Sequence, residues 1–151
     1  MSDEASLLNA LIGNWNQNIA TRYSELANAS AYLNSIFDNI NWVGFYLTDG
    51  DNLKLGPFQG KIACNSIAFS DGVCGTAYKE GKTLIVDNVH TFEGHIACDK
   101  DSNSEIAVPL IAEGKVVGLI DIDSENFARF TEKEQEMLEE MAEVLVNKLF
   151  L

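Results

Sequence analysis

Three cysteines are the residues of this sequence best suited to chemistry. Cys64, Cys74 and Cys98 each lie beside residues typical of turns or loops. A cysteine attacks as the thiolate, which a helix N-terminus or a nearby positive charge favours, and Cys74 stands near the start of a short helix predicted over 72–80. His95, three residues before Cys98, could assist that thiol. The alternative is that each cysteine is a small buried hydrophobic side chain.

A zinc site is a second alternative, because three cysteines together with His90 and His95 would provide enough ligands. Zinc ligands usually come in close pairs, separated by about two to five residues. The cysteines are ten and twenty-four residues apart, and only the two histidines have such a spacing. We therefore expect no bound metal.

Aromatic and acidic residues share faces in the predicted strands, where alternate side chains point to the same side of a sheet. In each strand the opposite face is apolar, so these residues could line one pocket if the strands are neighbours. Two acids on one face repel each other, and burial would raise their pKa values, so that one could donate a proton to a substrate oxygen. In the alternative, the acids are solvated and the aromatic residues belong to the core. The set is Trp42, Tyr46, Glu105, Asp121 and Asp123.

Helices are predicted at both ends of the chain. Apolar residues recur at intervals of three and four over 6–19, and a second helix is expected over 22–37. Near the C-terminus, Thr131 and Glu134 form a capping-box pattern that begins a third helix. The apolar face of that helix contains Leu138, Met141, Leu145 and Leu149.

The middle of the chain has the pattern of strands separated by turns. Asp-Gly and Glu-Gly pairs at 49–50 and 113–114 favour antiparallel hairpins. The expected fold class is α+β, with an antiparallel sheet of about six strands flanked by helices from the N- and C-termini, in a single domain over 1–151. The strands are predicted over 42–48, 53–58, 66–69, 83–86, 105–110 and 115–123.

Composition excludes several partners. The net charge is −13, and the ten Lys and Arg residues are scattered, so no basic stripe is available to bind nucleic acid or an anionic membrane. The acidic N-terminus lacks the pattern of a signal peptide, and no apolar run approaches the ~20 residues of a membrane span. We expect a cytoplasmic protein, in which any disulfide is transient.

Five segments together resemble the free methionine-(R)-sulfoxide reductases, which are GAF-domain enzymes. The resemblance covers nearly the whole chain and implies a GAF-type fold. It also leaves one alternative, a noncatalytic GAF sensor of small molecules or redox state. The segments are Gly56–Cys64, Gly72–Ala77, His95–Asp99, Ser104–Glu105 and Asp121–Ser124.

The resemblance implies a role for each cysteine. Cys98 would be the nucleophile, whose thiolate attacks the sulfoxide sulfur, releases methionine and becomes a sulfenic acid. Cys64 would resolve this intermediate as a disulfide, with Cys74 as a second candidate resolving thiol. An external dithiol such as thioredoxin would then reduce the enzyme, so no bound cofactor is expected.

The resemblance also assigns the pocket. The acidic residues of the set described above would polarise the sulfoxide oxygen and hold the substrate amino group, and its aromatic residues would form a wall for the S-methyl group. Backbone amides around Ile96, Ala97 and Cys98 would hold the substrate carboxylate. A homodimer is compatible with the family.

Overall fold

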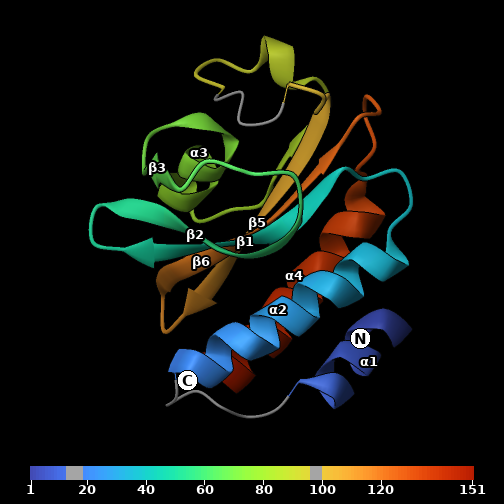
Figure 1. Ribbon diagram of the computed structural model, residues 1–151, viewed down its shortest axis with the longest axis vertical. Coiled ribbons are helices and arrows are strands. Elements are labelled where there is room, and N and C mark those ends of the chain that lie inside the picture. The colour runs from blue at the N-terminus through green and yellow to red at the C-terminus, as the bar shows by residue number, and fades with distance from the viewer. Residues whose placement is uncertain (13–18, 96–99) are drawn as a thin grey trace.

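The computed structural model describes residues 1–12, 19–95 and 100–151. Within these ranges the centre is a six-stranded antiparallel sheet in the order β3-β2-β1-β6-β5-β4 (Figure 1). No strand bound differs from its predicted position by more than two residues. The strands are β1 (Trp42–Asp49), β2 (Asn52–Gly60), β3 (Ser66–Ala68), β4 (Leu84–Val86), β5 (Ser104–Ala112) and β6 (Lys115–Ser124).

Helices cover both faces of this sheet. The long helices α2 (Ile19–Ile36) and α4 (Glu132–Leu149) pack on one face, with α1 (Asp3–Leu11) beyond them, and both chain termini lie on this side (Figure 1). The other face carries α3 (Gly72–Glu80), which has the predicted bounds, and the 3-10 helix η1 (Val89–Thr91). The sheet therefore separates a helical layer from a layer built of α3, η1 and loops.

Side-chain alternation divides the interior into two cores. Val43 and Phe45 of β1 belong to the larger core, beneath the long helices. Trp42 and Tyr46, on the opposite face, belong to a smaller core that includes Cys74 of α3. The predicted division of β1 into an apolar face and an aromatic face is confirmed.

The first predicted helix is wrong in its extent. Instead of one helix over 6–19, α1 begins at Asp3 and ends at Leu11, and Ile12 has the extended angles φ −87° and ψ 128°. Ile19 is the first residue of α2, three residues before the predicted start of that helix. A regular apolar spacing predicts a helical face, but it does not show where one helix ends and the next begins.

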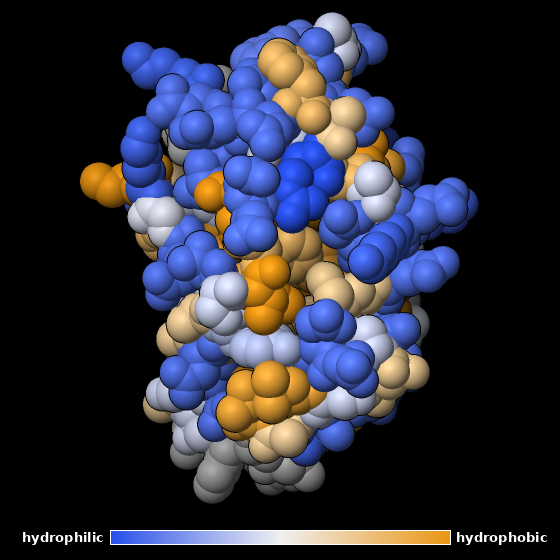
Figure 2. All heavy atoms as spheres, turned by 90° about the vertical axis from the view of Figure 1, so that its right-hand side faces the viewer, coloured by the Kyte–Doolittle hydropathy of each residue, from blue (hydrophilic) through white to orange (hydrophobic). Residues whose placement is uncertain are grey.

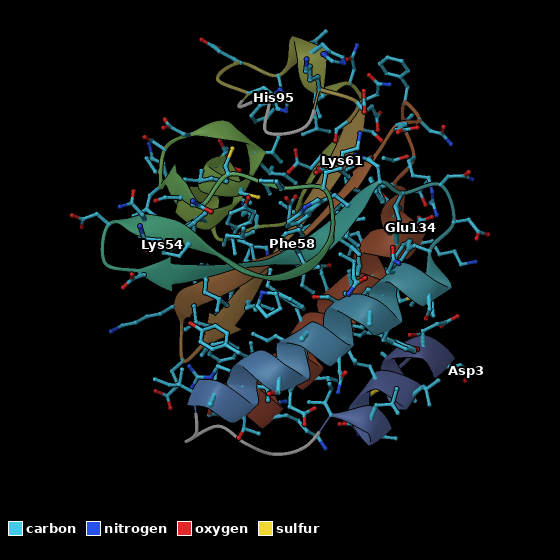
Figure 3. All side chains as sticks on the ribbon, in the orientation of Figure 1. Asp3, Lys54, Phe58, Lys61, His95 and Glu134 are labelled. Atoms are coloured by element: carbon cyan, nitrogen blue, oxygen red, sulfur yellow. The ribbon has the colours of Figure 1, made fainter. Side chains whose placement is uncertain are left out.

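Helix α4 begins as its sequence predicts. The backbone N–H of Thr131 donates a hydrogen bond to Glu134 Oε2 at 3.0 Å, and the reciprocal capping-box contact is also present. Glu134, labelled in Figure 3, accepts a second hydrogen bond from Arg129 at 3.1 Å. The capping box therefore satisfies backbone groups that would otherwise lack partners at this helix end.

The outer surface reflects the acidic composition. Figure 2 shows one face on which hydrophilic residues surround separate groups of hydrophobic residues. Across the described ranges, none of the helices combines the length and the apolar character that crossing a bilayer requires.

Helix α1 offers a matched test of its packing. Leu8 is fully buried in the larger core, whereas its neighbour Leu7 is 51% exposed. Leu8→Ala should lower the free energy of unfolding by about 2–4 kcal/mol, because it removes buried apolar contacts and leaves a cavity. Leu7→Ala should change it by less than about 0.5 kcal/mol. Urea unfolding monitored by circular dichroism measures both, and equal losses would contradict the observed packing.

Candidate functional site

The register of three neighbouring strands brings the acidic residues together. In the pairing of β1 with β6, Trp42 lies opposite Asp123, and in the pairing of β6 with β5, Asp123 lies opposite Glu105. Asp121 is two residues from Asp123 and therefore shares its face. The condition attached to the sequence prediction, that these strands are neighbours, is met.

These residues line one pocket between the sheet and α3. The pocket encloses about 550 Å³, including its open mouth. Its wall combines a stacked aromatic surface with four acidic side chains, one of them Asp71, and a thiol. The sequence-predicted residues that it brings together are Trp42, Tyr46, Cys74, Glu105, Asp121 and Asp123.

Close packing of α3 against the sheet places Cys74 in the pocket. A Cβ atom at Gly75 would lie 2.7 Å from the carbonyl oxygen of Ala68, so only glycine allows this approach. Cys74 lies in the first turn of α3, and its Sγ is 3.8 Å from Glu105 Oε2. The predicted position of Cys74 near a helix start is confirmed.

The surroundings of Cys74 oppose formation of its thiolate. Burial raises the pKa of this thiol well above its usual value, and the charges of Asp121 and Glu105 raise it further. A helix N-terminus would lower the pKa, but the combined effect of burial and of the nearby acidic groups outweighs it. Cys74 is therefore a protonated thiol near neutral pH, which makes it a poor nucleophile.

Burial also favours the protonated form of the acids in the pocket. The pKa of Glu105 is raised well above the usual value, first by burial and then by the charges of Asp121 and Asp123. Burial raises the pKa of Asp121 as well. Because two adjacent buried carboxylates cannot both ionise cheaply, Glu105 and Asp121 retain a proton between them.

Trp42 and Tyr46 form the aromatic part of the wall. The Trp42 ring stacks on Tyr46 with centroids 5.9 Å apart and on Phe58 with centroids 5.1 Å apart. Burial, followed by the charge of Asp121, raises the pKa of Tyr46, so its hydroxyl stays protonated. The wall presents a rigid apolar surface beside the acids.

The same two aromatic residues hold the segment that carries Cys64. Trp42 Nε1 donates a hydrogen bond to the carbonyl oxygen of Lys61 at 3.1 Å, and the Tyr46 hydroxyl donates to that of Cys64 at 3.0 Å. Figure 3 shows Phe58, Lys61 and His95 on the side of the sheet that carries α3. The segment over 61–64 is thus anchored to the pocket wall.

The cysteines differ in their state. Cys64 is disulfide-bonded and partly buried, whereas Cys74 is a free, buried thiol. Ile96, Ala97 and Cys98 lie outside the described residues, so their roles stay predictions.

Sequence reasoning missed several pocket residues on loops. Ser102 lines the pocket and accepts a hydrogen bond from Asn41 Nδ2 at 3.0 Å. His95 lines it too, although the sequence suggested it as a residue that assists Cys98 or as a zinc ligand. Burial, followed by the charge of His90, lowers the pKa of His95, so its ring is neutral at pH 7. Alternation identifies the faces of strands but carries no signal in loops. The position of Ser102 just before the start of β5 is the one feature of the sequence that could have indicated it.

The pocket contains a group of side chains that could hold a metal ion, but it is not the group that the number of cysteines and histidines suggested. Within the described ranges, the single group of three or more such side chains is Cys74, Glu105 and Asp121. Neither histidine belongs to it. His90 Nε2 instead lies 2.7 Å from Asn103 Oδ1.

The raised pKa of Glu105 predicts that replacing this residue with neutral Gln stabilises the fold, and that the gain in stability depends on pH. Glu105→Gln should raise the free energy of unfolding at pH 8 by about 1 kcal/mol or more, because a tenfold change in proton affinity corresponds to about 1.4 kcal/mol. The wild type loses stability as pH rises above the unfolded-state pKa of about 4.3 towards the higher folded-state pKa. The gain should therefore be smaller at pH 5 than at pH 8.

Urea unfolding at both pH values measures this difference. Glu113→Gln, at an exposed acid in the turn after β5, is the matched control and should show little change at either pH. A loss of stability in Glu105→Gln at pH 8 would show that the carboxyl is ionised and compensated in the fold.

Comparison with known proteins identifies the family of this chain. The GAF domain family model matches residues 26–147. Free methionine-R-sulfoxide reductase of Escherichia coli (strain K12) is 47% identical over 141 residues, which is 93% of this chain and 83% of that protein.

Solved structures extend the similarity to three dimensions. The reduced form of fRMsr of Staphylococcus aureus has a TM-score of 0.89 at 44% identity, covering 97% of this chain and 92% of that chain. Free methionine-R-sulfoxide reductase from Neisseria meningitidis, in complex with its substrate, has a TM-score of 0.87 at 40% identity, covering 99% of this chain and 92% of that chain. The chain therefore belongs to the GAF-domain family of free methionine-R-sulfoxide reductases.

Proposed function

We propose that this protein reduces free L-methionine-(R)-sulfoxide to L-methionine in the pocket between α3 and the sheet. The observation that carries the proposal is the buried acid Glu105, whose pKa burial raises, beside the aromatic wall of Trp42 and Tyr46. A methyl sulfoxide needs both surroundings, since its oxygen must gain a proton and its methyl group is apolar. Family membership supports the same substrate.

Glu105 donates a hydrogen bond or a proton to the sulfoxide oxygen, which makes the sulfur a better electrophile. The Cys98 thiolate attacks that sulfur. The oxygen passes to Cys98, which becomes a sulfenic acid, and methionine leaves as the reduced thioether. Asp121 shares the proton of Glu105 and keeps it available at neutral pH.

Recognition of a free amino acid requires partners for both of its charged ends. Asp123, half-buried at the pocket wall, binds the substrate ammonium group. Backbone amides at Ile96 and Ala97 bind the carboxylate. With Trp42 and Tyr46 against the methyl group, the pocket accommodates a single small molecule.

Cys64 resolves the sulfenic acid. Its thiol displaces water from the oxidised Cys98 and forms a disulfide, which an external thioredoxin-like dithiol then reduces in a compartment such as the cytoplasm. Two observations support Cys64 over Cys74. Cys64 occurs in the disulfide form, whereas Cys74 is free and its raised pKa disfavours the attacking thiolate. Cys74 instead supports Glu105 through the contact of 3.8 Å.

Steady-state turnover tests the pocket roles. Purified protein with dithiothreitol should form methionine from the R epimer of free methionine sulfoxide and not from the S epimer, as measured by chromatography. Asp123→Asn should lower kcat/KM by about 100-fold or more, the usual scale for a lost polarising or binding charge at a reacting centre.

Asp49→Asn is the matched control, because Asp49 is an exposed acid at the far end of β1, and its turnover should match the wild type. Circular dichroism verifies that both variants fold. Full activity in Asp123→Asn, or in Cys98→Ser, would overturn the assigned roles. Binding of methionine sulfoxide by the wild type without turnover would favour a noncatalytic GAF sensor.

A single turnover without reductant tests the resolving step. Peptide mapping should find Cys64 linked to Cys98, with Cys74 still available for alkylation after unfolding. Cys74→Ser should still form this disulfide, because that residue takes no part in the bond. Cys64→Ser should instead accumulate a sulfenic acid that dimedone traps. A disulfide between Cys74 and Cys98 in the wild type would assign resolution to Cys74.

A further inference from the structure

Three buried ligating side chains converge in the pocket from separate elements. Cys74 comes from α3, Glu105 from β5 and Asp121 from β6. One ligand atom from each lies within 4.8 Å of the other two. The three residues are 3%, 8% and 5% exposed, respectively, so water does not compete freely for them.

A second observation indicates that this cluster lacks a positive partner. Asp121 Oδ1 is buried and has no hydrogen-bond partner, although an unpaired buried carboxylate oxygen is costly. Asp121 lines the pocket, and no Lys or Arg is among the described residues of the pocket wall. A cation at this point would satisfy the oxygen and offset the repulsion among the acids.

The ligand types select the kind of cation. A thiolate with two carboxylates suits a borderline ion such as Zn²⁺, whereas Mg²⁺ and Ca²⁺ prefer oxygen ligands alone. Ligand atoms around tetrahedral zinc are about 3.5 Å apart, given Zn–S near 2.3 Å and Zn–O near 2.1 Å. The distance of 3.8 Å between Cys74 Sγ and Glu105 Oε2 is already close to this value.

We propose that Zn²⁺ binds Cys74, Glu105 and Asp121 and thereby blocks the pocket against the sulfoxide. The metal replaces the protons on these groups and occupies the acid that would otherwise polarise the substrate. The case for cation binding depends only on the geometry of these three side chains. Inhibition rests in addition on the proposed function, because it requires that the sulfoxide use the same acid.

A Co²⁺ titration tests binding independently of turnover. The reduced full-length variant Cys64→Ser/Cys98→Ser leaves Cys74 as the sole thiol, so a thiolate-to-cobalt charge-transfer band reports this residue alone. One Co²⁺ per chain should produce the band, and Zn²⁺ should abolish it by displacement. In this background Asp121→Asn should weaken Co²⁺ binding by about 10-fold or more, whereas Asp49→Asn should leave it unchanged. Absence of the band, or equal binding in Asp121→Asn, would overturn the site.

Single-turnover kinetics test inhibition. Pre-reduced enzyme freed of small thiols should form methionine more slowly with Zn²⁺ than without it, and EDTA should restore the rate. The ratio of the rate without Zn²⁺ to the rate with Zn²⁺ should fall towards one in Cys74→Ser. An unchanged ratio in that variant would overturn inhibition through this site. If Co²⁺ binds but the wild type forms no methionine, the proposed function fails and the metal site stands; normal turnover with no Co²⁺ binding gives the opposite result.

Discussion

Mutual repulsion among three carboxyl groups is the constraint on which the site depends. Strand register sets Glu105 beside Asp123, and alternation places Asp121 on the same face. Side chains in a sheet cannot move apart as loop residues can, because backbone pairing holds their positions. The fold therefore forces these groups into a partly desolvated pocket, and the protein responds by retaining protons there. The raised proton affinity of the pocket acids, on which the proposed reduction of a sulfoxide depends, is a product of the sheet pairing.

The larger core provides the stability that this arrangement costs. Phe45 and Ile122 face the long helices, while their strand neighbours Tyr46 and Asp121 face the pocket. Each central strand thus joins an apolar, well-packed side to a side that carries polar and acidic groups. Helix α3 completes the second side only because Gly75 permits close contact with the end of β3. The polar face is held in place by packing on the opposite face.

Alternation in the sequence predicted the strands and the pocket set, because successive side chains of a strand point to opposite faces and the two faces of this sheet differ in chemistry. The same reasoning failed for the first helix. Apolar spacing over 6–19 suggested a continuous helix, but the chain leaves the helical conformation at Ile12, and Leu11 is exposed. A spacing of three and four describes local geometry, whereas the end of a helix depends on tertiary contacts with α4 that the spacing does not contain.

The chemistry of Cys74 shows a similar limit. Its position near a helix start predicts a lower pKa, yet burial beside acids far away in sequence raises it. Ser102 was not predicted, and His95 was not predicted as a pocket residue, because no periodicity marks a loop. Family resemblance supplied the substrate and the roles of the three thiols, since neither composition nor spacing distinguishes a sulfoxide from other small polar molecules.

Trp42 and Tyr46 have two duties at once, since the rings that line the pocket also donate hydrogen bonds to the segment of Cys64. In the proposed mechanism, substrate selectivity and the redox cycle therefore depend on the same two side chains. Any change of these rings that adapts the pocket to a bulkier molecule also loosens the segment that carries Cys64, the thiol for which we propose the resolving role. New specificity must therefore evolve through other wall residues, or else be accompanied by a new anchor for that segment.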